Sequence, residues 1–184
     1  LMKYGLAPVI KQAFEEIYKA PFIAKILLAE LGVKPERDLF LSINYDGNFE
    51  ESRGWAALGA TASVQGRMRR YVESQPAFAQ ASLAQAVELA LCTWAVGSLA
   101  QAASESTAAE SSSTQLSEEQ TEGDGSSLPD KAALLAHVRQ TVAEKSLECV
   151  LLERRGPGSA KYRALRPEEL GRLLPSAVSS PATT

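Results

Sequence analysis

The segment RDLFLSINYDG occupies residues 37–47. From Leu39 to Tyr45, apolar residues partly alternate with polar ones, which is typical of a strand with one buried face. Asp46-Gly47 is a dipeptide favoured in tight turns between antiparallel strands. Apolar runs on either side, over residues 22–31 and 55–60, predict one strand before this segment and one after it. Three short strands joined by turns indicate an antiparallel meander.

Helical periodicity returns on both sides of the meander. Residues 8–19 form an amphipathic pattern, with Pro8 suited to the first turn. Ser63 is expected to cap a helix that runs to Ser74, and Ser82 to cap a second one that reaches about residue 95. Because the second helix is apolar on nearly every side, we expect it to lie buried between a sheet and another layer. The later elements predicted are a helix over residues 129–145, strands over 147–153 and 161–165 joined by a hairpin turn at 154–158, and a short helix from Pro167 to about Leu174.

This order of elements favours a layered α+β domain over a doubly wound α/β domain. Residues 1–101 hold its core, and residues 129–174 close the same domain. Residues 102–128 are acidic and Ser-rich, with no Lys or Arg. They have too little apolar area to offset roughly 1–2 kcal/mol of backbone entropy per ordered residue, so we expect a flexible insertion. The alternative for residues 102–128 is a phosphorylated switch. Residues 175–184 are predicted to be a disordered tail.

Composition excludes several classes of protein. The chain has 184 residues and a net charge of -3, so there is no basic excess for nucleic-acid binding. No uninterrupted apolar run of about 18 residues predicts a membrane span, and the first residues do not resemble a secretory signal. Two cysteines make no disulfide framework, which favours a reduced, cytoplasmic setting. Leu1 precedes Met2 in a segment that soon becomes helical, so we expect the sequence to begin inside a longer product.

Residues with catalytic or metal-binding chemistry are sparse. His137 is the only histidine and is interpreted as a helix-surface residue, and neither Cys92 nor Cys149 has a CxxC partner. No GxSxG, Walker-type or GxGxxG motif is present. The turn at residues 59–63 could hold an anion, but a tight strand-to-helix connection explains it better. The arginines at 67, 69 and 70 spread around a helix, and the adjacent Glu pairs at 15/16, 50/51 and 168/169 point apart. We therefore predict no catalytic, cofactor-binding or metal-binding residue in this chain.

The ordered motifs resemble a known family. The segment 37–47 with its Tyr45-Asp46-Gly47 turn, a variable acidic turn, and the run from Trp55 to Gly59 resemble the middle of a proteasome α-type subunit of the bacterial kind. A helix follows a few residues later in that family, and a second helix opens with Ser-Leu-x-x-Ala, as at residues 82–86 here. The resemblance covers most of residues 8–101 and 147–174.

The resemblance implies a partial four-layer αββα sandwich, the N-terminal nucleophile hydrolase fold. It implies a non-catalytic subunit that forms an outer ring with copies of itself, stacks on catalytic β-type subunits, gates protein substrates and docks a regulatory ATPase. In β-type subunits of that family an N-terminal threonine supplies the nucleophile, and its α-amine supplies the base. The family's N-terminal third is expected to be missing here, and the acidic insertion is longer than the family pattern. Two alternatives remain open: a catalytic peptidase whose threonine lies upstream of Leu1, and a stand-alone interaction module of the same fold.

Overall fold

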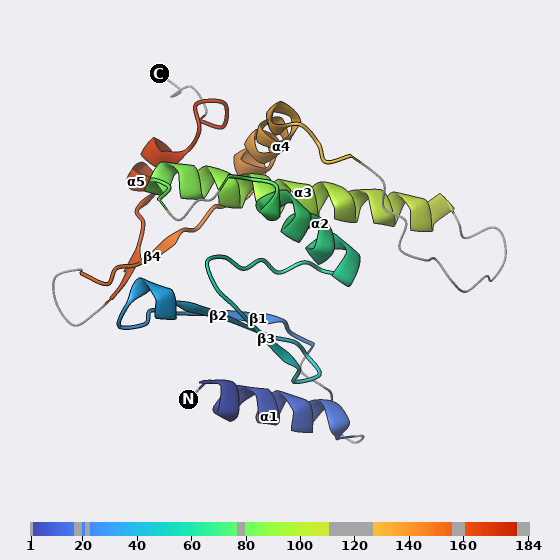
Figure 1. The fold of residues 1–184 in the computed structure, drawn as a ribbon. Helices are drawn as coiled ribbons and strands as arrows, with labels where there is room; N and C mark the ends of the chain where they lie inside the picture. Colours follow the sequence, from blue (N-terminus) through green and yellow to red (C-terminus); the bar gives the residue numbers. More distant parts are fainter. Residues whose placement is uncertain are drawn as a thin grey trace. The chain divides into compact units, whose positions relative to one another are not determined.

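The computed structural model describes residues 2–16, 20, 23–76, 80–110, 127–155 and 161–179. The fold is mixed α+β, as the sequence predicts, with helices and two small sheets (Figure 1). The chain divides into two compact units. Unit 1 comprises Leu1–Leu58 and Val150–Arg163, and unit 2 comprises Gly59–Cys149 and Ala164–Thr184. Residues 129–174, which were expected to complete a single domain with residues 1–101, therefore contribute to both units.

The sheet of unit 1 is an antiparallel meander in the order β1-β2-β3. β1 (Ile26–Glu30) and β2 (Leu39–Ile43) lie within the runs that the sequence predicts, but β3 (Phe49–Ser52) does not. The run at residues 55–60, expected to be the third strand, contains no strand.

The turn after β2 explains why the third strand starts early. The Asn44 N–H donates to the Asn48 carbonyl at 2.8 Å, and the Asn48 N–H donates to Asp46 Oδ1 at 2.9 Å. Gly47 supplies the positive φ of 80° that this turn requires. The chain has therefore already reversed at residue 48, and the acidic segment that follows pairs with β2.

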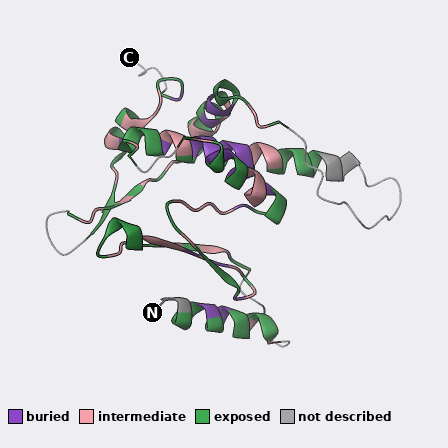
Figure 2. Ribbon diagram, in the orientation of Figure 1, coloured by how far each residue is buried: buried purple, intermediate pink, exposed green. Residues whose placement is uncertain are grey.

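Helix α1 (Met2–Glu15) packs on one face of this sheet. It starts earlier than predicted, so Pro8 lies inside the helix instead of in its first turn. Residues 17–19, the predicted end of this helix, lie outside the described residues. The contact is an apolar cluster, purple where it is buried in Figure 2. Its buried members are Ala7, Ile10, Leu41 and Ile43, with Ile26 and Leu28 packed beside them.

Strands β4 (Val150–Leu152) and β5 (Tyr162–Ala164) form a two-stranded sheet, as the sequence predicts, although each is shorter than expected. The pairing continues beyond both strands, because the Glu153 N–H donates to the Lys161 carbonyl at 2.7 Å. Most of the predicted turn, residues 156–158, lies outside the described residues.

Unit 2 is built around α3 (Leu83–Glu110), which packs against α2 (Ala62–Glu73), α4 (Lys131–Glu144) and α5 (Pro167–Leu173). The starts of α2 and α3 are fixed by side-chain caps. Thr61 caps α2, where Ser63 was expected, while Ser82 caps α3 as predicted through reciprocal bonds with Gln85. The buried core lies between these helices: Tyr71, Val87, Leu91, Cys92, Ala95, Val96, Leu134, Leu135, Val138, Leu170 and Val178.

The described residues of unit 2 differ from three expectations. Helix α3 is not buried all round, because Trp94 is 39% exposed and Ala90 is exposed. The same helix continues to Glu110, into the segment expected to be flexible, since its alanines at 102, 103, 108 and 109 are strong helix formers. In the segment expected to be a disordered tail, Val178 is only 3% exposed and belongs to the core. The remainder of both segments, residues 111–126 and 180–184, lies outside the described residues.

One described helix segment, Leu83–Ser106, is long and apolar enough to cross a membrane on length and composition alone, which the sequence analysis did not anticipate. Its buried residues, including Cys92, Ala95 and Val96, pack in the core of unit 2. The core helix of a globular protein passes the same test of length and composition, and 39% of the apolar window is buried here, so this helix alone is weak evidence for a membrane span.

Candidate functional site

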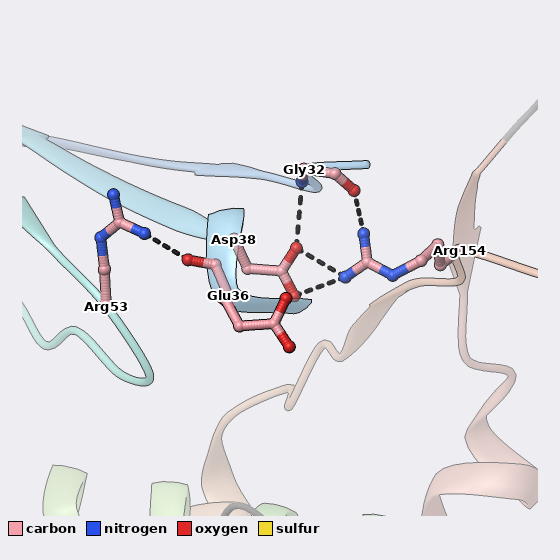
Figure 3. A network of polar contacts seen from close by, with 5 residues as sticks. All are labelled: Gly32, Glu36, Asp38, Arg53 and Arg154. Atoms are coloured by element: carbon pink, nitrogen blue, oxygen red, sulfur yellow. Dashed lines mark hydrogen bonds and ion pairs between the residues drawn. The ribbon is translucent and has the colours of Figure 1, made fainter. Parts of the chain in front are cut away.

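A polar site held by several hydrogen bonds lies in unit 1, in a loop that we call the clamped loop (residues 32–38) (Figure 3). Its two ends are joined because the Gly32 N–H donates to Asp38 Oδ1 at 3.0 Å. Arg154 follows β4, and its Nη2 donates to both Asp38 carboxylate oxygens at 2.6 Å. The other guanidinium nitrogen, Nη1, donates to the Gly32 carbonyl, so one arginine holds both ends of the loop.

Inside the loop, a 3-10 turn at Pro35–Arg37 fixes the backbone. The Glu36 carbonyl accepts a hydrogen bond from Arg53, which follows β3. Gly32 leaves no room for a side chain, since a Cβ there would lie 2.6 Å from the Arg37 carbonyl oxygen. The loop is therefore tied at three places by groups from separate segments of unit 1.

The electrostatics of the clamped loop follow from this geometry. The hydrogen bond from Arg154 lowers the pKa of the Asp38 carboxyl below its usual value, and the Gly32 N–H acts in the same direction. The carboxylate and the guanidinium are 35% and 26% exposed, so their attraction is partly screened by water. The lowered pKa favours the charged form of Asp38, which suits its ion pair with Arg154.

The tip of the clamped loop is exposed. Val33 is 86% exposed, and Lys34, Pro35 and Glu36 are exposed beside it. An apolar side chain is thus presented to solvent by a loop whose backbone is held in one shape.

Unit 2 contains an apolar pocket of about 440 Å³, which we call the Trp94 pocket. Trp94 stacks on His137 with 5.7 Å between ring centroids, and His137 Nε2 lies 3.0 Å from Ser98 Oγ. The polar residues among those lining the pocket include Lys145 and Glu148, both exposed. The apolar lining comes from α3, α4, α5 and the segment before β4: Val87, Ala90, Leu91, Trp94, Val138, Val142, Leu147, Cys149 and Leu170.

A second pocket of unit 2, of about 390 Å³, is more polar. Tyr71, Glu88, Cys92 and Lys131 meet there, and Lys131 forms an ion pair with Glu88 that raises the lysine pKa. Burial raises the pKa of the Cys92 thiol and of the Tyr71 phenol. A thiol that stays protonated is a poor nucleophile, so this cysteine is placed for packing and not for covalent chemistry.

The residues singled out in the sequence do not converge. His137 is half-buried beside Trp94 instead of lying on an open helix surface, and Cys92 and Cys149 are free thiols. Gly59 makes a tight connection, since a Cβ there would lie 2.6 Å from the Gln65 nitrogen, which supports the simpler interpretation of residues 59–63. Among the described residues, no group of three or more His, Cys, Asp and Glu side chains could hold a metal ion.

The charged residues singled out have local roles where the contacts are known. Glu15 pairs with Lys11 at 3.8 Å, and Glu169 accepts from the Arg166 N–H at the start of α5. Of the three α2 arginines, Arg67 is half-buried, whereas those at 69 and 70 are exposed. They do not form one continuous exposed face.

Sequence reasoning did not identify either the Asp38–Arg154 pair or the Trp94 pocket. The two charges are separated by 116 positions, and nothing in one sequence pairs them. No family model, curated protein or solved structure matches this chain.

Proposed function

We propose that this chain is a non-catalytic α-type subunit of a proteasome core particle, with a fold that is part of a four-layer αββα sandwich. In this role it forms an outer ring with copies of itself and stacks on a ring of catalytic β-type subunits. It then contributes to the gating of protein substrates and to the docking of a regulatory ATPase.

The observation that carries the proposal is the local structure of residues 39–110. β2 ends in the Tyr45-Asp46-Gly47 turn with its glycine at positive φ, and an antiparallel strand follows. A glycine with no space for a side chain then precedes two packed helices, α2 and α3. The turn, the glycine and the two helices are features on which the resemblance to α-type subunits rests, in the same order along the chain. The second strand of that pattern differs, because it lies at Phe49–Ser52 and not at residues 55–59.

Exposed apolar side chains in unit 1 give independent support. Val33 and Tyr162 are 86% and 63% exposed. Single exposed apolar residues are common in monomeric proteins, but a chain that assembles into a ring has partners available to cover them.

Native mass spectrometry of the purified chain tests the proposal, alone and after co-expression with a β-type subunit. For the chain alone we expect a particle that contains several copies, with a mass several times 19.7 kDa. After co-expression we expect a larger particle that contains both chains. A single species near 19.7 kDa in both experiments would contradict the proposal and favour a stand-alone module.

A fluorogenic peptide assay separates the proposal from the catalytic alternative. The isolated chain is expected to show no turnover. Turnover that is blocked by a threonine-directed inhibitor would overturn the non-catalytic role, even if the chain assembled into a ring.

A further inference from the structure

We propose that the tip of the clamped loop of one copy inserts into the Trp94 pocket of a second copy, so that the chain assembles head to tail. This inference rests on the proposed ring function and names the contact that builds the ring. The two partners are an exposed apolar tip in unit 1 and an apolar pocket in unit 2 of the neighbouring copy.

The tip is suited to binding because it is both exposed and preorganised. Val33 is 86% exposed, yet the loop that carries it is held by Arg154 at both ends and by Arg53 at the Glu36 carbonyl. A loop already fixed in its bound shape loses little conformational entropy on association. Pro35, next to the tip, further restricts the backbone.

The pocket is suited to receive an apolar tip. Its volume of about 440 Å³ equals the liquid-state share of roughly 15 water molecules, at ~30 Å³ each, which is space for more than one side chain. Trp94 contributes a partly exposed aromatic surface, and aromatic residues are enriched among the residues that dominate protein interfaces.

The charges beside the two elements are complementary. Val33 is followed by Lys34 and, two residues later, by Glu36, all exposed. The pocket has Glu148 and Lys145, also exposed. Each element thus carries one exposed positive and one exposed negative charge, so Lys34 can pair with Glu148 and Glu36 with Lys145 across the contact. This charge complementarity favours a second copy of the chain as the occupant of the Trp94 pocket.

The symmetry of the contact agrees with a ring. A tip on one part of the chain and a pocket on another make a heterologous contact, because each copy uses both surfaces with different neighbours. Heterologous contacts close into rings when the rotation between copies permits. A two-fold dimer would instead use the same patch on both copies.

Disulfide trapping in the full chain gives the first test. Cys149 lines the pocket, so a Val33→Cys variant places a thiol at the tip opposite a native one. Mild oxidation is expected to produce a ladder of covalent multimers on a non-reducing gel, and Cys149→Ser in the same variant is expected to abolish it. Cross-linking only within single chains, or a ladder that persists without Cys149, would overturn the inference.

Charge and polarity variants give a second test, read by native mass spectrometry. Val33→Asp is expected to reduce the ring to single chains, whereas the matched control Ile23→Asp, at an equally exposed site, leaves it intact. Lys34→Glu is expected to raise the dissociation constant between copies at least tenfold. Adding Glu148→Lys to this variant is expected to restore the wild-type affinity.

The outcomes of this second test separate the two proposals. If the ring persists in Val33→Asp, or if Val33→Asp and Ile23→Asp disrupt it equally, the proposed contact is contradicted, while the proposed subunit role is unaffected. A wild-type chain that forms no ring, alone or with a β-type subunit, would sink the subunit role itself.

Discussion

Gly47→Ala should destabilise unit 1 more than any other exchange of a glycine for alanine at a turn of the described structure. Gly47 has φ of 80°, and a Cβ built there would lie 2.8 Å from the Ala7 carbonyl oxygen and closer still to Lys11 Cβ. The new methyl group would therefore push directly against helix α1, whose packing on the sheet buries Ala7 and Ile10.

The expected cost can be divided into two parts. The left-handed backbone costs alanine about 1–2 kcal/mol, and the reduced entropy of the unfolded chain offsets ~0.4–1 kcal/mol of that. Overlap with the packed backbone of α1 adds about 1–3 kcal/mol, as other overpacked sites do. Together these give a loss of about 2–4 kcal/mol in the free energy of unfolding of unit 1.

Gly54→Ala is the matched control. Gly54 has nearly the same backbone, with φ of 84°, but a Cβ there would meet nothing within 4 Å. The Gly54→Ala variant should lose only the contribution of the left-handed backbone, about 1 kcal/mol of the free energy of unfolding. Urea unfolding is followed by the fluorescence of Trp55 in a Trp94→Phe background, which leaves the only tryptophan in unit 1. Equal losses in the two variants would refute the contact between the turn and α1.

Three further outcomes are expected. Asp38→Asn should cost about 1–2 kcal/mol at pH 7, a value reduced for solvent screening. Because the folded pKa of Asp38 is lowered by Arg154, this stabilisation is fully present above the unfolded pKa of about 3.9 and is lost as the pH falls through the folded pKa, so the urea midpoints of variant and wild type should approach each other as the pH is lowered below the unfolded pKa. Leu134→Ala should cost about 2–5 kcal/mol in thermal unfolding because the side chain is fully buried, and Trp94→Ala should cost less because Trp94 is 39% exposed; the reverse order would contradict the assigned core. Cys92 should resist iodoacetamide in the native protein and react once urea unfolds it, as mass spectrometry of the labelled peptides would show; rapid native labelling would contradict its burial and its raised pKa.

The sequence predicted the meander but misplaced its third strand, for a local reason. Phe49–Ser52 is acidic and short, so its pattern resembles a solvated turn, whereas residues 55–60 have the apolar composition of a strand. Pairing with β2 overrides composition, because the short turn closed by the Asn44–Asn48 hydrogen bond brings residue 49 opposite Ile43 at once. Turn chemistry at Asp46-Gly47 was the better guide to where β3 begins.

The helices α1–α5 of the described residues follow the predicted order, and the errors lie at their ends. Thr61 competes with Ser63 as a cap, and only the observed bond from the Val64 N–H to the threonine hydroxyl distinguishes them. The candidate contacts were beyond sequence reasoning because they join distant segments. Arg154 follows β4, whereas Asp38 and Gly32 flank the turn between β1 and β2, and the contact brings these distant segments of unit 1 together.

The length of α3 has a consequence for its dynamics. At 1.5 Å per residue its 28 residues span about 42 Å, but residues 101–106 are exposed, while Leu91–Gly97 are buried apart from Trp94. Backbone amides near Val96 should exchange with deuterium only when unit 2 opens as a whole, while those of residues 101–106 should exchange through local fraying. The helical circular-dichroism signal should therefore decline gradually on heating before the main unfolding transition, as the outer turns melt ahead of the core.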